Sequence, residues 1–508
     1  MTSLPEALAR LWRAEESANM VQFEGSWVTW GQVRSLTEEI DAQLTAAGCS
    51  AGGRVAVVLD NRVESVATLL AIIRGSRTLV PVSPLQPPER LSADLQATDV
   101  GYVLAAQEWW ARQDFTAAAT DLGASGWSVE GDALAVRVTA THDAVPGDPS
   151  VAIEMLTSGT TGPPKRIPLT RGQLEISLGA ALRHNDRPEI REKPSLTGSV
   201  ALVMAPIVHI GGLWGLLQAL ASARRLVLLE RFSLLAWHAA ITEHRPALIG
   251  LPPPAMRAVL DSDIPREDLT SIRAVTAGTS PVDPMLVDAF LQRFGIPVLI
   301  VYGATEFAGA VAGWTLKEFR TQWNDKKGSV GRAFPGVRLQ VVDDDGVVAP
   351  AGQTGHLQVA SRQLGRPSDE WVVTSDLAHI DGDGFLYIDG RSDDVIVRGG
   401  FKIAPETVLR SLRRHEAVHD GAVAGLPDAR LGQIPIAAVE LRPDASVTPE
   451  ELREHCRVSL TPYEIPAAIY IVDELPRGAA MKVDRRRLVE MLERLRVAPA
   501  ETRLTNPE

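Results

Sequence analysis

Cysteine is almost absent from this chain of 508 residues, which contains only Cys49 and Cys456. Two cysteines so far apart do not have the spacing of zinc ligands, and their scarcity indicates a reducing compartment, which we expect to be the cytoplasm. Basic residues are also outnumbered: the chain has 51 basic and 63 acidic residues, which gives a net charge of −12. Proteins that bind nucleic acid need clustered lysine and arginine, so the composition argues against that class of function.

Long hydrophobic stretches are rare as well. The N-terminus has no apolar core of the kind found in secretory signals. Only residues 201–222 lack charged side chains over a length that could span a bilayer. Pro206, His209 and the pair Gly211–Gly212 interrupt this segment, so we expect a buried strand, turn and helix rather than an integral membrane span.

The first 300 residues alternate short apolar runs with amphipathic helical patterns. Apolar strands separated by helices predict an α/β fold, in which parallel sheets are covered by helices on both faces. The expected strands are 54–60, 78–84, 100–106, 225–230, 247–253, 272–278 and 296–303, and a helix is expected at 62–75.

The pattern changes twice in the last third of the chain. Residues 337–360 alternate with period two around turn residues, which predicts antiparallel hairpins in a β-rich subdomain. Beyond residue 387 a hairpin, a helix at 406–414, a strand at 437–442 and two more helices predict a small α+β unit. We therefore predict a large N-terminal domain over residues 1–391 and a small, mobile C-terminal domain over residues 392–508.

Lysine is scarce too, at seven of the 51 basic residues. A chain that prefers arginine but keeps a lysine in a motif indicates a need for a compact charge. Lys165 ends the segment TSGTTGPPK, residues 157–165, whose glycines and hydroxyls would allow close approach to phosphates. This is not the common P-loop, because the lysine follows two prolines and Arg166 stands in place of a hydroxyl. Alone, the segment is also compatible with a flexible surface loop.

Four further motifs follow in order: YGATE (302–306), TSD (374–376), GRSDDVIVRGGFKIAPE (390–406) and LPRGAAMKVDR (475–485). Together the five resemble the signature set of the adenylate-forming (AMP-binding) superfamily, which includes acyl-CoA synthetases, peptide-synthetase adenylation domains and luciferases. The resemblance extends from about residue 20 to about residue 490. It implies ATP-dependent conversion of a carboxylic acid to acyl-AMP with release of pyrophosphate, with ATP, Mg²⁺ and CoA as cofactors.

The resemblance also implies roles for individual residues. Tyr302 would stack on adenine, Thr305 would bind the α-phosphate and Glu306 would coordinate Mg²⁺, whereas Asp376 would hold the ribose hydroxyls and Arg391 the ribose or phosphate. The remaining nucleotide-binding residues implied are Thr157, Ser158, Gly159, Thr160, Thr161, Gly162, Lys165, Gly278, Thr279 and Gly303.

A second group of residues would act with the C-terminal domain. Lys482 would bridge the incoming carboxylate and the α-phosphate during adenylation, and Asp393 would be the hinge. After the domain swings, Gly400 and Lys402 would line the pantetheine tunnel, with contact to phosphate as the alternative role of Lys402. The sequence departs from the family pattern at three places: Thr279–Ser280 replace Gly-Ala, Ser375 replaces glycine, and Met481 replaces the glycine before Lys482. The geometry of these loops is therefore in doubt, rather than their roles.

Small or apolar residues are expected around the acyl group, namely His209, Ile210, Gly211, Gly212, Gly278, Ala308, Gly309 and Ala310. They favour an apolar acid, fatty or aromatic. Residues 206–212 contain no aspartate to pair with an ammonium group, which disfavours an amino acid. His209 resembles an aromatic gate beside the carboxylate, and a packed core imidazole is the alternative.

Three functions fit this pattern. The first is an acyl-CoA ligase whose partners are the acid and CoA, with a homodimer as one compatible assembly. The second transfers the acyl group from acyl-AMP to a carrier protein or an amine. The third is a nucleotide-binding module without activity.

Overall fold

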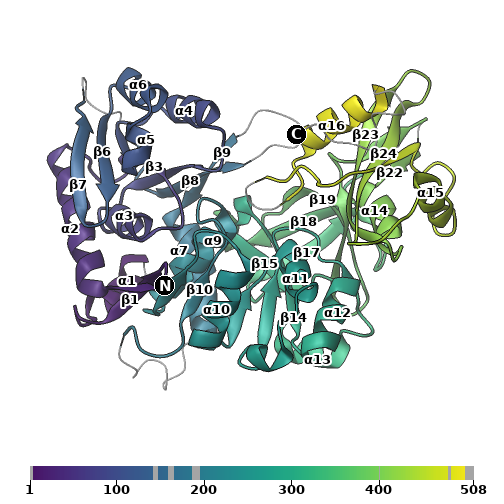
Figure 1. Ribbon diagram of the computed structural model, residues 1–508, viewed down its shortest axis with the longest axis horizontal. Helices are drawn as coiled ribbons and strands as arrows, with labels where there is room; N and C mark the ends of the chain where they lie inside the picture. Colours follow the sequence, from purple (N-terminus) through teal and green to yellow (C-terminus); the bar gives the residue numbers. More distant parts are fainter. Residues whose placement is uncertain are drawn as a thin grey trace.

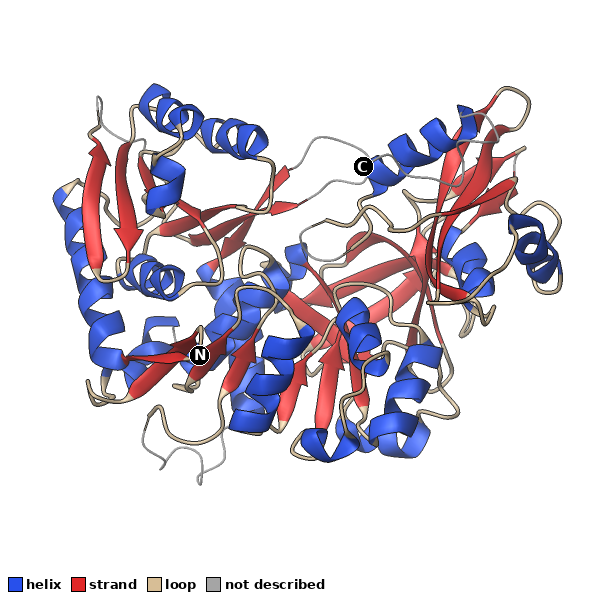
Figure 2. Ribbon diagram, viewed as in Figure 1, coloured by secondary structure: helices blue, strands red, loops and turns tan. Residues whose placement is uncertain are grey.

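The structure is a computed structural model that describes residues 4–140, 147–157, 165–185, 195–399, 401–478 and 482–497. Its described residues form five sheets. The largest sheet lies at the left of Figure 1, the C-terminal lobe lies at the upper right, and the other sheets lie between and below them (Figure 1). Helices flank the large sheet on both faces (Figure 2).

The large sheet has seven strands in the order β7-β6-β5-β3-β4-β8-β9, with a parallel centre and antiparallel edges. Val55 and Val57 of β3 pack with α2 and α3, whereas Ala56 and Val58 pack on the opposite face with α4 and α6. This alternation is what a strand covered on both sides requires. The strands are β3 (Arg54–Val58), β4 (Thr78–Val82), β5 (Tyr102–Ala105), β6 (Ser125–Glu130), β7 (Ala133–Val138), β8 (Val151–Thr157) and β9 (Lys165–Thr170), and the helices are α2 (Trp30–Ala46), α3 (Val63–Arg74), α4 (Pro88–Gln96), α5 (Gln107–Trp110) and α6 (Gln113–Asp121).

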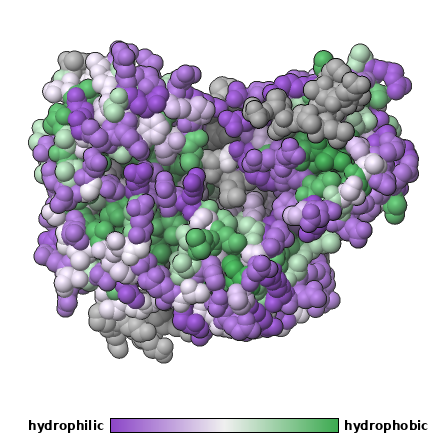
Figure 3. Space-filling model, viewed as in Figure 1, coloured by the Kyte–Doolittle hydropathy of each residue, from purple (hydrophilic) through white to green (hydrophobic). Residues whose placement is uncertain are grey.

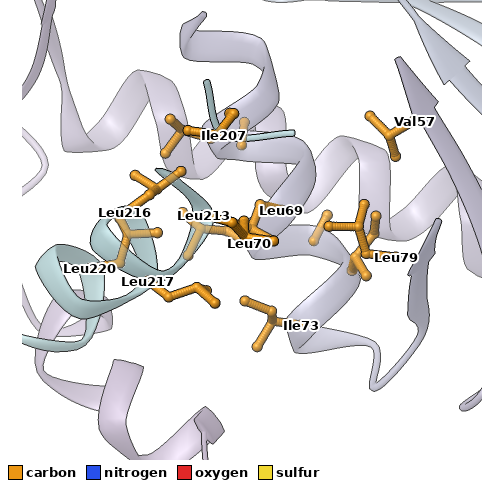
Figure 4. Close-up of a cluster of buried hydrophobic side chains, with 14 of the residues drawn as sticks. Val57, Leu69, Leu70, Ile73, Leu79, Ile207, Leu213, Leu216, Leu217 and Leu220 are labelled. Carbon is orange, nitrogen blue, oxygen red and sulfur yellow. The ribbon is translucent and has the colours of Figure 1, made fainter. Parts of the chain in front are cut away.

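A four-stranded sheet, β10-β11-β1-β2, lies beside it. Its strands are β1 (Asn19–Phe23), β2 (Ser26–Thr29), β10 (Ala201–Val203) and β11 (Leu226–Leu228), accompanied by α1 (Leu4–Trp12), α7 (Arg171–Asn185) and α9 (Ile210–Ala221). The core between the two sheets is formed by α3 and α9, whose Leu69, Leu70, Ile73, Leu213 and Leu217 point toward one another (Figure 4). This packing fixes the axis of α9, and with it the position of the helix N-terminus.

The third sheet has the order β12-β13-β14-β15-β16, with its first three strands parallel. Its strands are β12 (Leu248–Gly250), β13 (Ala274–Ala277), β14 (Val298–Ala304), β15 (Gly309–Gly313) and β16 (Arg332–Ala333). The helices of this region are α10 (Leu234–His244), α11 (Pro253–Leu260), η1 (Arg266–Leu269), α12 (Pro284–Phe294), η2 (Thr305–Phe307) and α13 (Leu316–Gln322).

An antiparallel sheet follows, with the order β17-β18-β19-β20. Its elements are β17 (Val337–Val342), β18 (Gly355–Ser361), η3 (Arg362–Leu364), β19 (Val372–Ile380) and β20 (Leu386–Arg391). The C-terminal lobe contains the fifth sheet, β22-β21-β24-β23, with β25 paired to β24. Its elements are β21 (Ile396–Arg398), β22 (Phe401–Ile403), α14 (Pro405–Arg413), β23 (Val418–Asp428), β24 (Gly432–Leu441), α15 (Pro449–Arg457), β25 (Ala468–Ile471) and α16 (Arg485–Val497).

The predicted fold class is confirmed: large α/β sheets, a β-rich subdomain and a smaller α+β lobe are all present. The expected strands of the first 300 residues all exist, although they divide among three sheets rather than one. Two strands of the C-terminal lobe, β23 and β25, were not predicted. The boundary between residues 391 and 392 stays a prediction, although β20 and β21 belong to different sheets.

The uncharged segment 201–222 forms β10, a turn and α9, as its proline and glycines predicted. In the parts of the chain that the structure describes, no helix combines the length and the apolar character needed to cross a membrane.

The α3–α9 core predicts a stability difference between two leucines. Leu216 is fully buried in this core, whereas Leu235 at the start of α10 is 83% exposed. We expect Leu216→Ala to lower the free energy of unfolding by about 2–5 kcal/mol, because it removes buried contacts and leaves a cavity. Leu235→Ala is the control and should change it by less than about 0.5 kcal/mol. Denaturant unfolding followed by tryptophan fluorescence measures both, and equal effects would contradict this account of the core.

Candidate active site

The YGATE motif lies at the point where β14 ends and the chain turns back into β15. Thr305 and Glu306 form the short η2 turn, and Ala308 closes it with a positive φ of 53°. Gly303 allows the two strands to touch here, since a Cβ on it would lie 2.3 Å from the carbonyl oxygen of Gly309. The tight turn presents Thr305 and the exposed Glu306 at the carboxyl end of a parallel strand, where ligands bind in open α/β sheets.

Tyr302 connects this turn to the antiparallel sheet. Its hydroxyl donates a hydrogen bond to the carboxylate of Asp376 on β19. Asp376 pairs in register with Arg391 on β20, and an Arg391 Nη1 atom lies 3.9 Å from Asp376 Oδ1. The Arg391 guanidinium also donates two hydrogen bonds of 2.8 Å to Asp393. Four of the residues predicted from the motifs therefore form one connected chain of polar contacts.

The charges of this chain reinforce one another. The ion pair with Asp393 raises the pKa of Arg391, and the charges of Asp376 and Glu306 act in the same direction. Burial and the neighbouring Asp376 carboxylate raise the pKa of Tyr302, so the phenol stays protonated and remains a donor. Glu306 is thus close enough to Arg391 to influence it, which brings the predicted metal ligand and the predicted ribose residues to one side of the site.

The opposite side is built by the N-terminus of α9. His209 is the N-cap residue of this helix, and its Nε2 atom is buried without a hydrogen-bond partner among the described residues. A Cβ on Gly211 would lie 3.1 Å from the methyl group of Thr279, so the first turn of α9 lies against the segment after β13. Thr279 itself has a positive φ of 67°, the conformation for which the glycine that it replaces is suited. Gly278 lies against β14, since a Cβ there would be 2.8 Å from the carbonyl oxygen of Val301.

Lys482 lies in the cleft between these two sides. Its charge acts on His209, and burial together with this charge lowers the pKa of His209 to about 4. Surrounding protein and the charge of Arg391 lower the pKa of Lys482. Lys482 is nevertheless exposed to solvent. The molecular surface is hollowed at the top, between the lobe of the seven-stranded sheet and the C-terminal lobe (Figure 3).

The glycine-rich segment connects two paired strands. Thr157 ends β8 and Lys165 begins β9, and the two residues are register partners. The strand β9, which follows the segment, contacts η2, the turn of Thr305 and Glu306. Arg166 has a structural role here, because it donates 2.7 Å and 3.1 Å hydrogen bonds to Asp94 and to the carbonyl of Pro81.

Several predicted residues fall outside the described residues, namely Ser158, Gly159, Thr160, Thr161, Gly162, Gly400 and Met481. Lys402 lies in β22 opposite Val397, and only its backbone is described. Thr157 likewise is described by its backbone alone. The roles of all these residues stay predictions.

Sequence reasoning missed a contact behind the expected acyl region. The indole N–H of Trp214 on α9 donates a 2.8 Å hydrogen bond to Ser177 on α7. Gly309 lies against this pair, since a Cβ on it would be 2.7 Å from Ser177 Oγ. No local pattern marked this pair, because Ser177 and Trp214 are 37 residues apart on different helices.

Metal binding by protein groups alone has no support in the part of the chain that the structure describes, since no three His, Cys, Asp or Glu side chains cluster there. A magnesium ion beside Glu306 would therefore need phosphate oxygens as its other ligands, which is how this ion is usually bound. A cavity of about 240 Å³ lies elsewhere, at the carboxyl ends of β3 and β5 around Asp60, and shares no residue with the cleft.

Comparison with known proteins extends over nearly the whole chain. Residues 9–367 match the family model of the AMP-binding enzyme, and residues 410–482 match that of the AMP-binding enzyme C-terminal domain. Sulfoacetate–CoA ligase of Cupriavidus necator is 30% identical over 92% of both chains. Indoleacetate–CoA ligase of Aromatoleum aromaticum is 30% identical over 94% of this chain and 96% of its own. The amide bond synthetase McbA of Marinactinospora thermotolerans has a similar structure, with a TM-score of 0.80 and 24% identity over 96% of this chain and 99% of its own.

The position of Lys482 can be tested through the ionisation of His209. A nearby positive charge disfavours the imidazolium form, so Lys482→Ala should raise the pKa of His209 from about 4 toward its ordinary value. Burial should still keep it below about 6.5. NMR titration of labelled histidines measures the shift. Lys317→Ala, on the exposed surface of α13, is the control and should leave His209 unchanged. An unchanged His209 pKa in Lys482→Ala would place the lysine outside the cleft.

Proposed function

Because the chain belongs to the AMP-binding enzyme family, we propose that it is an AMP-forming acid–thiol ligase. It uses ATP to convert a carboxylic acid to acyl-AMP with release of pyrophosphate, and then transfers the acyl group to CoA. The observation that carries this function is that Lys482 of the C-terminal lobe lies close enough to His209 and Arg391 of the large lobe for their charges to interact. Two relatives that are 30% identical over more than nine tenths of the chain have CoA ligase names, which supports the same reaction type.

Lys482 and His209 act on the carboxylate of the acid. A carboxylate resists reaction with an anionic phosphate because like charges repel one another, and the Lys482 amine offsets that repulsion as the two oxygen-bearing groups approach. His209 is uncharged at neutral pH, since its pKa is about 4. Its Nε2 atom, which has no partner among the described residues, can therefore form a hydrogen bond with the acid. The neutral imidazole adds no second positive charge beside Lys482.

The nucleotide is held by the opposite wall. Asp376 already accepts the Tyr302 hydroxyl, and its remaining lone pairs can accept the ribose hydroxyls. Thr305 and the segment from Thr157 to Lys165 bind the phosphates. Glu306 holds Mg²⁺, which when bound neutralises phosphate charge as the α-phosphorus is attacked. Asp393 is the hinge, and Gly400 and Lys402 line the pantetheine path of CoA.

The acid is apolar, either fatty or aromatic. Gly211, Gly212 and Ala308–Ala310 add no polar side chain to the acyl region, and the one indole N–H beside it is already bonded to Ser177. A buried ammonium or sulfonate would find no charge partner among these residues, and burying it unpaired would be costly. The side chain of the acid is therefore selected by shape.

The two cysteines bear on the compartment of the protein. Cys49 and Cys456 are free and buried, which supports a reducing, cytoplasmic location. A homodimer is one assembly compatible with the proposal.

A panel of acids tests the reaction. We expect pyrophosphate release and acyl-CoA, detected by mass, from medium-chain fatty acids or arylacetic acids, and neither product from amino acids. Omission of CoA should leave acyl-AMP on the enzyme. Acyl-AMP that moves only to an added amine or carrier protein would establish the alternative acceptor. A sample that releases no pyrophosphate with any acid would exclude the ligase.

The role of Lys482 predicts a split between the two half-reactions. Lys482→Ala should slow acyl-AMP formation by about 10²–10³-fold, because a preorganised charge on the transition state is lost. Thioester formation from supplied acyl-AMP should stay within about twofold of wild type, since Lys482 serves only the first step in this account. Lys317→Ala is again the matched control. Equal losses in both steps would contradict the assigned role.

A further inference from the structure

The loop that carries Lys482 is held by its own flanking residues. Residues Arg477 and Val483 form an isolated antiparallel bridge. The amide of Gly478 donates a 2.7 Å hydrogen bond to the carbonyl of Lys482, and the amide of Asp484 donates one of 2.7 Å to the carbonyl of Pro476. The backbone of Lys482 is therefore fixed relative to Arg477.

Arg477 is held in turn by two buried carboxylates. It donates hydrogen bonds of 2.8 Å to Asp420 and 3.2 Å to Glu440, which are 6% and 8% exposed. Arg413 donates a further 2.9 Å bond to Asp420. All four residues belong to the C-terminal lobe, so they move together with Lys482.

The large lobe reaches the same cluster through α11. Arg257 on this helix lies 3.8 Å from Asp420 Oδ1, and its side chain is 15% exposed. It also donates a hydrogen bond to the carbonyl of His419. This residue is a bulge: β23 and β24 shift register between Val418 and Asp420, so His419 has no register partner. A bulge leaves backbone groups outside the hydrogen-bond ladder of the sheet, and here the free carbonyl of His419 accepts the hydrogen bond from Arg257.

A second contact lies beside the first. Asp261, the C-cap residue of α11, has a carboxylate oxygen 3.8 Å from Nδ1 of His419. This pair is far more exposed, at 46% for Asp261, so solvent screens it. Arg257 is therefore the better shielded of these two contacts between α11 and the C-terminal lobe.

We propose that Arg257 is a positioning residue that holds the C-terminal lobe in the orientation that keeps Lys482 in the cleft. This inference rests on the proposed function, in which Lys482 serves the adenylation step. When the lobe swings, Arg413 and Arg477 stay with Asp420, whereas Arg257 stays behind with α11 and loses both acceptors. The contact thus stabilises only the adenylation orientation. A contact shifts an equilibrium between two orientations only by the difference in its interaction free energy between them. The Arg257 contact is made in one orientation only, so it favours the first half-reaction.

The test is Arg257→Gln, which keeps a hydrogen-bonding side chain and removes the charge. We expect acyl-AMP formation, measured in a single turnover, to slow by about tenfold, the equivalent of one buried charged hydrogen bond. Thioester formation from supplied acyl-AMP and CoA should be at least as fast as in wild type. Arg245→Gln is the matched control, since Arg245 is an exposed arginine of the same lobe that hydrogen-bonds to Thr270.

Two further variants separate positioning from general damage. Arg257→Lys should recover part of the adenylation rate because it restores the charge. In the Lys482→Ala background, Arg257→Gln should cause no further loss of the residual adenylation rate, since Arg257 acts through Lys482. Equal slowing of both half-reactions, no slowing, or additive losses in the double variant would each overturn the inference. Wild-type enzyme that releases no pyrophosphate would instead mean that the proposed function is wrong.

Discussion

The buried carboxylate of Asp420 is the interaction on which the geometry of the cleft depends. Removing a carboxylate from water is costly unless cations surround it, and here Arg413, Arg477 and Arg257 converge on it. Their charges hold the pKa of Asp420 well below its usual range against the effect of burial, so it stays ionised at any physiological pH. One of the three arginines begins the loop of Lys482 and another belongs to the large lobe. A single ionic cluster therefore connects the loop of Lys482 to the large lobe, which is the basis for the proposed role of Arg257 in orienting the C-terminal lobe.

The walls of the cleft, unlike the Asp420 cluster, depend on apolar packing. They are formed where a strand and a helix of the packed core end or begin. The η2 turn follows a parallel strand whose approach to β15 requires Gly303, and His209 begins a helix whose axis is fixed by the leucines of α3 and α9 (Figure 4). These elements are rigid because their positions follow from close-packed apolar side chains. The C-terminal lobe, by contrast, contacts α11 of the large lobe through the polar groups of Arg257 and Asp261. Such contacts can be broken and remade, which is what two half-reactions in one cleft would require.

The fold class and the family could be predicted from the sequence alone, because both depend on patterns of neighbouring residues. Unbroken apolar runs such as 54–58 give buried parallel strands, and five motifs in order identify AMP-binding enzymes. The strand β23 was missed because its sequence, VHDGAVAGLPD, contains polar, glycine and proline residues that are poor in strands. Its formation depends on ten residues of pairing with β24 and on cations that neutralise Asp420.

Arg257 had no local signal either, since a lone arginine on a helix is recognised as functional only when its distant partner is known. The roles of the motif residues themselves remain predictions, although the structure gathers Tyr302, Asp376, Arg391 and Asp393 into one chain of contacts.

The charges of the cleft act on Lys482 from two sides. Burial and then the charge of Arg391 lower the pKa of Lys482, and the charge of Lys482 acts with burial against protonation of His209. Arg391 is paired with Asp393 and lies 3.9 Å from Asp376, so these carboxylates offset part of its repulsion of Lys482. In the proposed function, triphosphate and carboxylate would add negative charge beside Lys482, and release of pyrophosphate would remove part of it again. On that proposal, bound substrates and the Arg257 contact would both favour the orientation that brings Lys482 to His209 and Arg391. The electrostatics of the site would then link the chemical state of the nucleotide to the position of the lobe.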